Sequence, residues 1–503
     1  MSLKNLKKNT VVVMVVIIIS KLIGMLRDVV LANYYGTSNV SDAYLIAVSV
    51  PTLLFYFIGH ALSTSFLPIY NKVKHDKGDA DALKYMNNLL CVSLLLCAVL
   101  VALLLAFPQV IVKLFATGFD VETTNIASKM IRMCAPSLFF MAIINVWSGY
   151  LHAKENFVLP AAISLPRNVA IITSIIVSAS CGINFLAIGL LVAYILELLF
   201  LLPSVFKNGY RPQLYVNLKD QEMKDTMVMV APIIIGIGVS QINKIIDKSL
   251  ASTIVVGGIS ALSYASIINN AVQEVLVTGI ITILFADCAK LVAQEKHDDV
   301  KDKLSQTINV MQALLIPATA GVIILAEPIV KLVLMRGSFD ESSLALTSGA
   351  LKGYTIGLVF LAMRDALIKV LCAYKDTRAT TITSSVAIVI NIVLNLILSK
   401  VLGVMGLAIA TSASTLCNCF MLYLILTKKM GNLGFKKMLS NILKVLLCTG
   451  IMGVLVYFMF NYWLIAIDET IRLFMCVAIG VVVYFAFALL LKIFKKERRV
   501  DIS

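Results

Sequence analysis

Long apolar runs alternate with short polar segments along the whole chain. Each run has at least the roughly 20 residues that an α-helix needs to cross the hydrocarbon core of a bilayer. The pattern therefore predicts fourteen transmembrane helices, several of them longer than a bilayer requires and hence tilted or extended beyond it. The predicted spans cover residues 10–33, 42–70, 86–115, 131–152, 159–180, 184–206, 226–250, 258–291, 307–334, 350–373, 379–400, 404–428, 438–462 and 469–493.

Basic residues gather in every second connection between these spans. Connections of the other parity, such as 36–39 and 253–258, contain no Lys or Arg. Because cytoplasmic connections carry an excess of Lys and Arg, the alternation predicts that both termini are cytoplasmic. The basic connections contain Lys72, Lys74, Lys77 and Lys84; Lys207, Arg211, Lys219 and Lys224; Lys296, Lys301 and Lys303; and Lys428, Lys429, Lys436 and Lys437.

Two pairs of similar segments indicate an internal repeat. IVKLFATGFD begins at Ile111 and IVKLVLMRGSFD begins at Ile329, each at the end of an apolar run. FLAIG at Phe185 is likewise matched by GLAIA at Gly406. Because an even number of spans per repeat keeps both copies in the same orientation, we expect two bundles related by an axis along the membrane normal, with a cavity between them.

The repeat also predicts the domain organisation. An N-terminal six-helix bundle is expected over residues 1–207 and a second six-helix bundle over 208–430. The last two spans lie outside the repeat, so residues 431–503 are expected to hold two additional helices and a basic cytoplasmic tail.

Composition supports the membrane class. Hydrophobic residues make up 60% of the 503 residues, more than in soluble domains, so we expect an all-α, polytopic membrane protein. The formal net charge of +15 does not indicate nucleic-acid binding, because the basic residues lie in the connections between apolar runs. The ten cysteines lie mostly in apolar runs and lack metal-ligand spacing.

The sequence lacks the signatures of an enzyme. Its four histidines are scattered along the chain, and neither a nucleophile elbow nor a Walker-type phosphate loop is present. We therefore expect no catalytic residue, no metal and no cofactor.

The first span contains three charged residues in the stretch SKLIGMLRDVV: Lys21, Arg27 and Asp28. A charge at the bilayer centre costs roughly 2.5–3.5 kcal/mol on insertion scales, so such residues usually face a cavity or a partner. Counted from Thr10 at 1.5 Å per residue, Lys21 lies roughly 16 Å deep, near the midplane, and Arg27 roughly 26 Å deep. The alternatives are side chains that snorkel to the interface and a structural ion pair between Asp28 and a basic neighbour.

The seventh span carries further polar residues in the stretch VSQINKIIDKSLAS. Gln241, Lys244 and Lys248 recur at helical spacing and so share one face, where they could line a cavity or snorkel to the nearby interface. Other charges inside apolar spans are candidates for ion coupling or for structural ion pairs. These are Glu197, Glu274, Arg364 and Asp365.

The opening SKLIGMLRDVVLANYYGTSNVSDAYLIAVSVPTLLFYFIGHALSTSFLPIY resembles that of the MurJ-type (MviN) lipid II flippases, within the multidrug/oligosaccharidyl-lipid/polysaccharide exporter superfamily. The similarity rests on a basic residue, a Gly, an Arg-Asp pair, a Gly-containing turn and an Asp-Ala-aromatic start of the second span. APIIIGIGVSQINKIID resembles the seventh span of this family, and the layout of fourteen helices extends the resemblance over the whole chain.

The resemblance implies a flippase that moves lipid II, the undecaprenyl-pyrophosphate-linked peptidoglycan precursor, across the bacterial cytoplasmic membrane by alternating access. Lys21 and Arg27 match the basic cavity residues that would hold the diphosphate, with Asp28 and Asp42 as their acidic neighbours. Asp42 begins the second span and could instead interact with a helix dipole. The polyprenyl tail would lie in a groove of the last two spans, near residues 480–487.

The motifs of the sequence also bear on how transport is driven. Since no nucleotide-binding motif is present, we expect the membrane potential or an ion gradient to drive transport. Moving one charge through 100 mV is worth roughly 2.3 kcal/mol, enough to bias the two states of a carrier. The expected partners are the lipid-linked glycan and membrane lipid, without nucleic acid, and the chain is expected to be a monomer.

Two positions depart from the family pattern. A basic residue is expected shortly after Pro51, where this chain has Phe55. The eighth span reads YASI, ending at Ile267, where the family has a cation after Tyr-Ala-Asp. Either Lys244 and Lys248 replace these cations, or the cargo is another lipid-linked oligosaccharide, such as a capsule or exopolysaccharide repeat unit.

A drug or cation antiporter of the same superfamily is a further alternative. Such a transporter needs acidic cavity residues to bind its cationic substrate. The basic residues Lys21 and Arg27 therefore argue against it.

Overall fold

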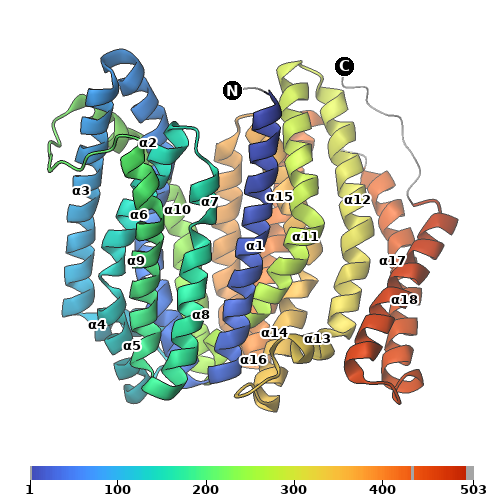
Figure 1. Ribbon diagram of the computed structural model, residues 1–503. Coiled ribbons are helices and arrows are strands. Elements are labelled where there is room, and N and C mark those ends of the chain that lie inside the picture. The colour runs from blue at the N-terminus through green and yellow to red at the C-terminus, as the bar shows by residue number, and fades with distance from the viewer. Residues whose placement is uncertain (1–2, 432–434, 494–503) are drawn as a thin grey trace. The chain divides into compact units, whose positions relative to one another are not determined.

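The computed structural model describes residues 3–431 and 435–493, and every regular element in these residues is a helix (Figure 1). The helices are α1 (Leu3–Tyr35), α2 (Asn39–Lys77), α3 (Asp79–Ala106), α4 (Pro108–Phe115), α5 (Val121–Cys134), α6 (Ser137–Ala153), α7 (Val158–Ala162), α8 (Ser164–Cys181), α9 (Asn184–Lys207), α10 (Gln221–Ile254), α11 (Gly258–Ala293), α12 (His297–Ile324), α13 (Ala326–Leu334), α14 (Glu341–Ile356), α15 (Leu358–Ala373), α16 (Thr377–Met430), α17 (Phe435–Phe458), the π-helix η1 (Met459–Trp463) and α18 (Glu469–Leu490).

Each predicted span coincides with helical segments, and the all-α membrane fold is confirmed. In the described residues, nine helices are long and apolar enough to cross a membrane. The pair α5 and α6, bent by 45°, provides a tenth span if it is counted as one. The number of fourteen spans therefore stays a prediction.

Some predicted spans are divided into a long and a short helix, at equivalent places in the two repeats. α3 ends before Phe107, and Pro108 occupies the first turn of α4. Proline is tolerated there because the first N–H groups of a helix have no intrahelical acceptor. Leu325 separates α12 from α13 in the second repeat.

The short helices α4 and α13 are each followed by an aspartate that caps the next helix. Asp120 accepts a hydrogen bond from the backbone N–H of Thr123 at 2.8 Å. Asp340 accepts one from the backbone N–H of Ser343, also at 2.8 Å. The two similar segments of the sequence therefore adopt the same local structure, which supports the internal repeat.

α16 contains two predicted spans, 379–400 and 404–428, without an intervening loop. The helix is kinked at Gly403, whose φ of 57° and ψ of −136° are not helical. Glycine adopts a positive φ readily because it has no Cβ. This residue therefore changes the direction of the chain between the two spans.

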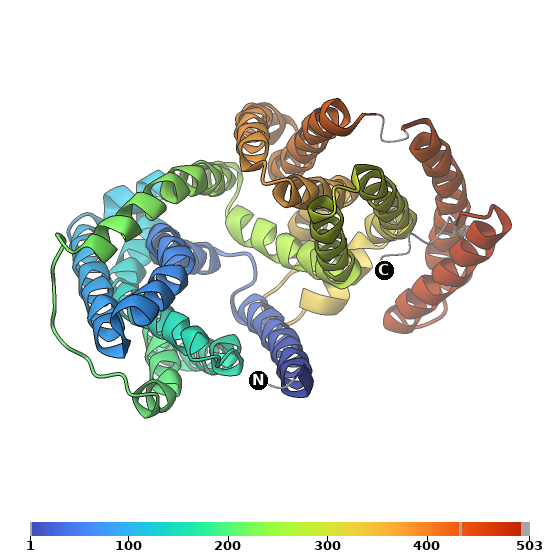
Figure 2. The same cartoon turned by 90° about the horizontal axis from the view of Figure 1, so that it is seen from above.

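Contacts between Cα atoms divide the chain into two compact units, and the first is Met1–Ser260 with Arg336–Phe339. Within it, α2 packs against α3, α5, α6 and α10, while α8 packs against α1 and α9. Figure 2 shows these helices end-on. α10 packs in this unit, although it begins the second copy of the repeat; the division of the chain at residues 207 and 430 stays a prediction.

The second unit is Ala261–Met335 with Asp340–Ser503. One buried core joins α11, α12, α15 and α16 around Met311 and Leu367. A second core joins α12 to α17 and α18 around Cys476. The last two helices, red in Figures 1 and 2, therefore pack on the outside of α12 rather than in the first core.

Candidate functional site

Arg27 on α1 forms a forked ion pair with the next residue, Asp28. Its Nε and Nη2 atoms donate to the Asp28 carboxylate at 2.8–3.0 Å, and Nη1 donates to Oδ1 of Asn168 on α8 at 3.3 Å. The guanidinium stays partly exposed, whereas the carboxylate is mostly buried. Asp28 thus makes the ion pair that the sequence left open as an alternative, and this pair fixes the orientation of the guanidinium.

Lys21 lies on the same helix, six residues before Arg27, and its side chain is exposed. Asn168 connects the two parts of α1, because its Nδ2 donates to the backbone carbonyl of Ser20 at 3.5 Å. Asn168 is not among the site residues predicted from the sequence. The sequence feature that could have indicated it is a polar amide beside Arg167, at the beginning of an apolar run.

Asp42 lies in the first turn of α2 and is only 2% exposed. Its carboxylate accepts hydrogen bonds from the backbone N–H groups of Gly257 at 2.9 Å and Ser260 at 2.8 Å. These groups lie at the start of α11, where backbone donors have no intrahelical acceptor. Asp42 therefore caps α11 and interacts favourably with its dipole, while its role as an acidic neighbour of Arg27 stays a prediction.

The two lysines of α10 contact α2. Lys248 donates from Nζ to the hydroxyl of Ser49, and Nζ of Lys244 lies 5.8 Å from the centroid of the Tyr56 ring, in the range of a cation–π interaction. Lys244 is exposed. Gln241 is 2% exposed, and its Oε1 accepts no hydrogen bond within the described residues, so this side chain is buried rather than at an open surface.

Glu197 on α9 is almost fully buried inside the first unit. Its carboxylate lies 3.2 Å from Nη1 of Arg167 on α8. A buried carboxylate is costly unless it is paired, so this contact supports a structural ion pair. A role of Glu197 in ion coupling stays a prediction.

Arg364 on α15 repeats the geometry of Arg27 within the second unit. Its Nε and Nη2 atoms donate to Oδ1 of the next residue, Asp365, at 3.0 and 2.6 Å. Gln273 on α11 donates to the other carboxylate oxygen at 3.2 Å. The neighbouring Glu274 is exposed. These residues thus form a polar cluster, and its part in ion coupling stays a prediction.

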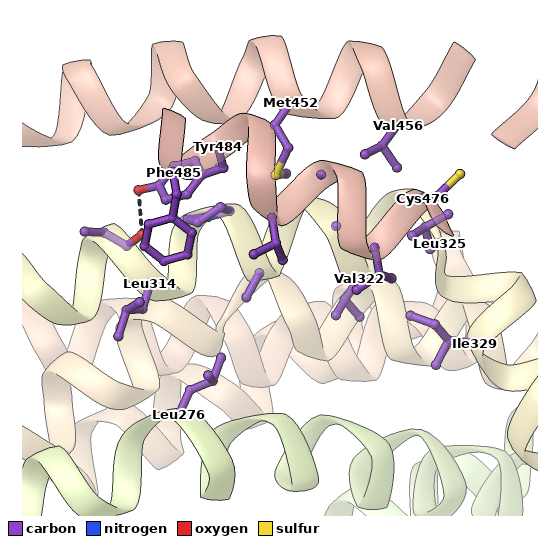
Figure 3. Close-up of a pocket in the computed structure, with 17 residues that line it drawn as sticks. Leu276, Leu314, Val322, Leu325, Ile329, Met452, Val456, Cys476, Tyr484 and Phe485 are labelled. Atoms are coloured by element: carbon purple, nitrogen blue, oxygen red, sulfur yellow. Dashed lines mark hydrogen bonds between the residues drawn. The ribbon is translucent and has the colours of Figure 1, made fainter. Parts of the chain in front are cut away.

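A cavity of about 330 Å³ lies in the second unit, where α17 and α18 face α12 and α13 (Figure 3). The Tyr484 hydroxyl donates to the backbone carbonyl of Ala313, so the phenol is satisfied and the remaining surface is apolar. The cavity includes part of the segment that the resemblance associates with a lipid tail. Its lining includes Val322, Val456, Gly480, Val481, Tyr484 and Phe485.

The sequence model of the family described as lipid II flippase MurJ matches residues 31–478. The chain belongs to the lipid II flippase MurJ family. A probable lipid II flippase MurJ of Thermotoga maritima is 27% identical over 482 residues, which cover 95% of each chain. The lipid II flippase MurJ of Thermosipho africanus is 27% identical over 414 residues, which cover 82% of this chain and 83% of that protein.

Solved structures agree with this assignment. A structure of lipid II flippase MurJ in an inward closed conformation superposes with a TM-score of 0.84 and 25% identity, covering 97% of this chain and all (100%) of that one. A multidrug resistance MATE transporter of the MOP superfamily shares the fold, with a TM-score of 0.65 and 15% identity over 84% of this chain and 98% of that one. The chain is thus a multi-pass transporter of the bacterial inner membrane and not an enzyme.

At the two positions where the resemblance predicts cations, this chain has apolar residues. Phe55 and Ile267 are both partly buried apolar residues. Phe55 is followed by Tyr56, and the amino group of Lys244 on α10 lies over the Tyr56 ring. A cation is therefore present beside one of the two positions, but it comes from a different helix.

Proposed function

We propose that the chain translocates lipid II from one leaflet of the cytoplasmic membrane to the other. Family membership over 31–478 is the observation that carries this proposal. The diphosphate and sugar of such a lipid cannot cross hydrocarbon unaided, since a buried charge needs a partner. The transporter must therefore provide cations at membrane depth.

Arg27 is the principal anchor for the diphosphate in this proposal. Asp28 and Asn168 hold the guanidinium, and the second N–H of Nη1 has no partner within the described residues. Arg binds phosphate oxygens through paired N–H groups, and such charge-assisted bonds are about twice as strong as neutral ones. The exposed Lys21 adds a point charge on the same helix.

Lys244 and Lys248 supply the further cations. Lys244 is exposed beside Tyr56, where a cation–π contact keeps its charge in place without neutralising it. Lys248 donates to a neutral hydroxyl, that of Ser49, rather than to a carboxylate. Both contacts support a role of these lysines in place of the cations missing at positions 55 and 267.

The apolar cavity of the second unit receives part of the polyprenyl tail. Its lining from α12, α17 and α18 offers apolar contact, and the only polar group of Tyr484 is already bonded to Ala313. Apolar burial of a chain is favourable in proportion to its contact area. The tail thus has an apolar surface to bind while the head group is moved.

The proposal also includes the orientation of the chain in the membrane and the energy source of transport. Both termini are cytoplasmic, because Lys and Arg gather in alternate connections. The chain acts as a monomer, and the membrane potential or an ion gradient drives the cycle. Reporter fusions after Lys77, Lys303 and Lys429 should all give a cytoplasmic signal.

Complementation tests the substrate. A bacterial strain depleted of its own lipid II flippase should grow and keep its shape when it produces this chain, and its vesicles should flip labelled lipid II. The matched control replaces Val482, an exposed residue of α18, by Ala and should behave like the parent chain. Flipping of a capsule-type lipid-linked glycan without any flipping of lipid II would contradict the proposal.

A further inference from the structure

The connection between α9 and α10 is an extended segment that lies along α3. It covers residues 210–219, which we name the strap, and it runs at the rim of the first unit in both views (green in Figures 1 and 2). Its contacts fix where it lies relative to the apolar part of α3.

Two buried asparagines of α3 hold the strap. The side chain of Asn87 donates to the carbonyl of Arg211 at 3.2 Å. Asn88 donates to the carbonyl of Asn217 at 2.8 Å and accepts from the backbone N–H of the same residue at 2.9 Å. These bonds satisfy backbone groups that have no partner in a helix or sheet. They also explain why α3 buries two amides.

The strap reaches the level at which α3 becomes predominantly apolar. Cys91 contacts the carbonyl of Gln213 with its Sγ at 3.9 Å. The apolar part of α3 begins at Leu89 and continues to Ala106. At 1.5 Å per residue this part is about 27 Å long, close to the thickness of a bilayer core. The middle of the strap therefore lies at the edge of the hydrocarbon.

The outward side of the strap is apolar. Leu214 is 100% exposed, and Val216 and Leu218 are each 52% exposed. Tyr215 and Asn217, which alternate with them, point inward: the Tyr215 hydroxyl donates to Asp220 at 2.9 Å. Alternation of this kind is expected of an extended segment with one packed and one free side.

Basic residues surround this apolar edge. Arg211 and Lys219 are exposed at its two ends, and Nζ of the exposed Lys84 lies 4.7 Å from the ring centroid of Tyr215. Apolar side chains combined with Lys and Arg are typical of elements that lie in a membrane interface, where the cations meet anionic head groups.

We propose that the strap is an interfacial anchor: Leu214, Val216 and Leu218 enter the head-group boundary of the leaflet on the basic side of the protein. Arg211, Lys219 and Lys84 contact lipid phosphates there. The strap stays at the boundary, because irregular backbone in the hydrocarbon core would leave N–H groups without acceptors. The anchor holds the connection between the two copies of the repeat at a fixed depth.

Depth-dependent quenching tests the anchor in the full-length protein. An environment-sensitive fluorophore is attached to Leu214→Cys in a Cys181→Ser background, which removes the exposed native thiol. The protein is placed in vesicles that contain phospholipids with a quencher near the top of the acyl chain. Asp76→Cys, in the exposed last turn of α2, is the aqueous control, and Leu103→Cys, on the exposed face of α3, is the lipid control.

We expect the label at position 214 to be quenched several-fold more than the label at 76, and to approach the label at 103. Quenching should increase with the fraction of anionic lipid. The anchor would be overturned if the label at 214 were quenched no more than the label at 76. It would also be overturned if a soluble protein, rather than lipid, covered the label at 214.

A second variant tests whether the hydrogen bonds between α3 and the strap are needed for the contact of the strap with lipid. Asn88→Ala removes two hydrogen bonds to the strap, while Ser93→Ala in the same helix removes only a bond to the carbonyl of Leu89. Quenching at 214 should decrease in the first variant and not in the second. Because lipid contact is the readout, a negative result for lipid II flipping would leave this test unaffected.

Discussion

The carboxylate of Asp42 lies 2.8 Å from the backbone nitrogen of Ser260, so a residue in the first turn of α2 caps α11. Other contacts of the first unit occur where α1 and α10 end. Thr117 and Ser249 share a hydrogen bond of 3.0 Å between their hydroxyls. Ser338 donates from its backbone N–H to the carbonyl of Asn33 at 2.8 Å.

Two glycines allow these contacts. A Cβ on Gly118 would lie 2.2 Å from the carbonyl oxygen of Ser252 at the end of α10. A Cβ on Gly337 would lie 2.3 Å from the carbonyl oxygen of Asn33 at the end of α1. In each case the loop that follows the short helix of one repeat packs on the first helix of the other repeat. These contacts thus reproduce the internal symmetry of the sequence.

Removing the Asp42 cap should destabilise the protein. Asp42→Ala leaves the buried N–H groups of Gly257 and Ser260 without an acceptor, which costs about 1–3 kcal/mol. The exposed cap Asp120→Ala is the matched control and should cost about 0.5–2 kcal/mol. Thermal unfolding in detergent should show a larger decrease of the unfolding temperature for Asp42→Ala than for Asp120→Ala. An equal decrease in the two variants would mean that burial adds nothing to the Asp42 cap.

Arg27→Ala should abolish transport while the protein remains inserted and abundant. A hydrogen bond to a charged group is worth about 1.5–3 kcal/mol, so substrate affinity should decrease roughly 10- to 100-fold. Arg27→Lys should retain part of the activity, because Lys lacks the paired N–H groups. Lys21→Ala should fail, whereas Lys21→Arg should be tolerated. Flipping is measured per amount of inserted protein.

A purely structural role of Arg27 gives a different pattern. The protein level would decrease in Arg27→Ala, because Asp28 would be left buried without its partner. Removing Asp28 as well would then restore the protein level. Normal flipping by Arg27→Ala would sink the phosphate site.

Replacement of both α10 lysines should reduce the flipping rate more than either single replacement. Lys244→Gln and Lys248→Gln keep similar length and remove one charge each, so one cation remains in either single variant. The double variant leaves α10 without a cation next to Ser49 and Tyr56. Flipping rates of the four proteins form a double-mutant cycle, and simple additivity would argue against a shared anion.

A disulfide between α10 and the loop after α4 should stop transport. The hydroxyls of Thr117 and Ser249 are 3.0 Å apart, so cysteines at these positions are close enough to bridge. If this end of α10 must leave the loop during the cycle, oxidation of Thr117→Cys/Ser249→Cys should arrest flipping and reduction should restore it. Thr117→Cys alone is the control, and undiminished flipping by the oxidised pair would show that the contact never opens.

Filling the apolar cavity should impair transport without unfolding the protein. Val481 lines the cavity and is exposed, so Val481→Trp introduces a large side chain into the space of the lipid tail. Val482→Trp is the matched control, because the neighbouring residue is exposed and lies outside the lining. We expect a higher KM for lipid II in the first variant alone, and equal kinetics would exclude tail binding there.

The sequence by itself determined the features that depend on local order. Apolar run length placed the helices, because a membrane span is defined by about 20 consecutive residues. The repeated segments correctly indicated paired local structures, since Asp120 and Asp340 cap through nearby backbone groups. The ion pair of Arg27 with Asp28 was likewise foreseeable, because the two residues are adjacent.

Only the tertiary structure decided which distant elements meet. Sequence could not assign Asp42 to α11, or Ser49 to Lys248, because those partners lie about 200 residues apart along the chain. It also missed the breaks at Phe107 and Leu325, since both lie inside continuous apolar runs. Hydropathy measures how apolar a helix is. Which other helix it packs against depends instead on side-chain shape and on which backbone donors are left unsatisfied.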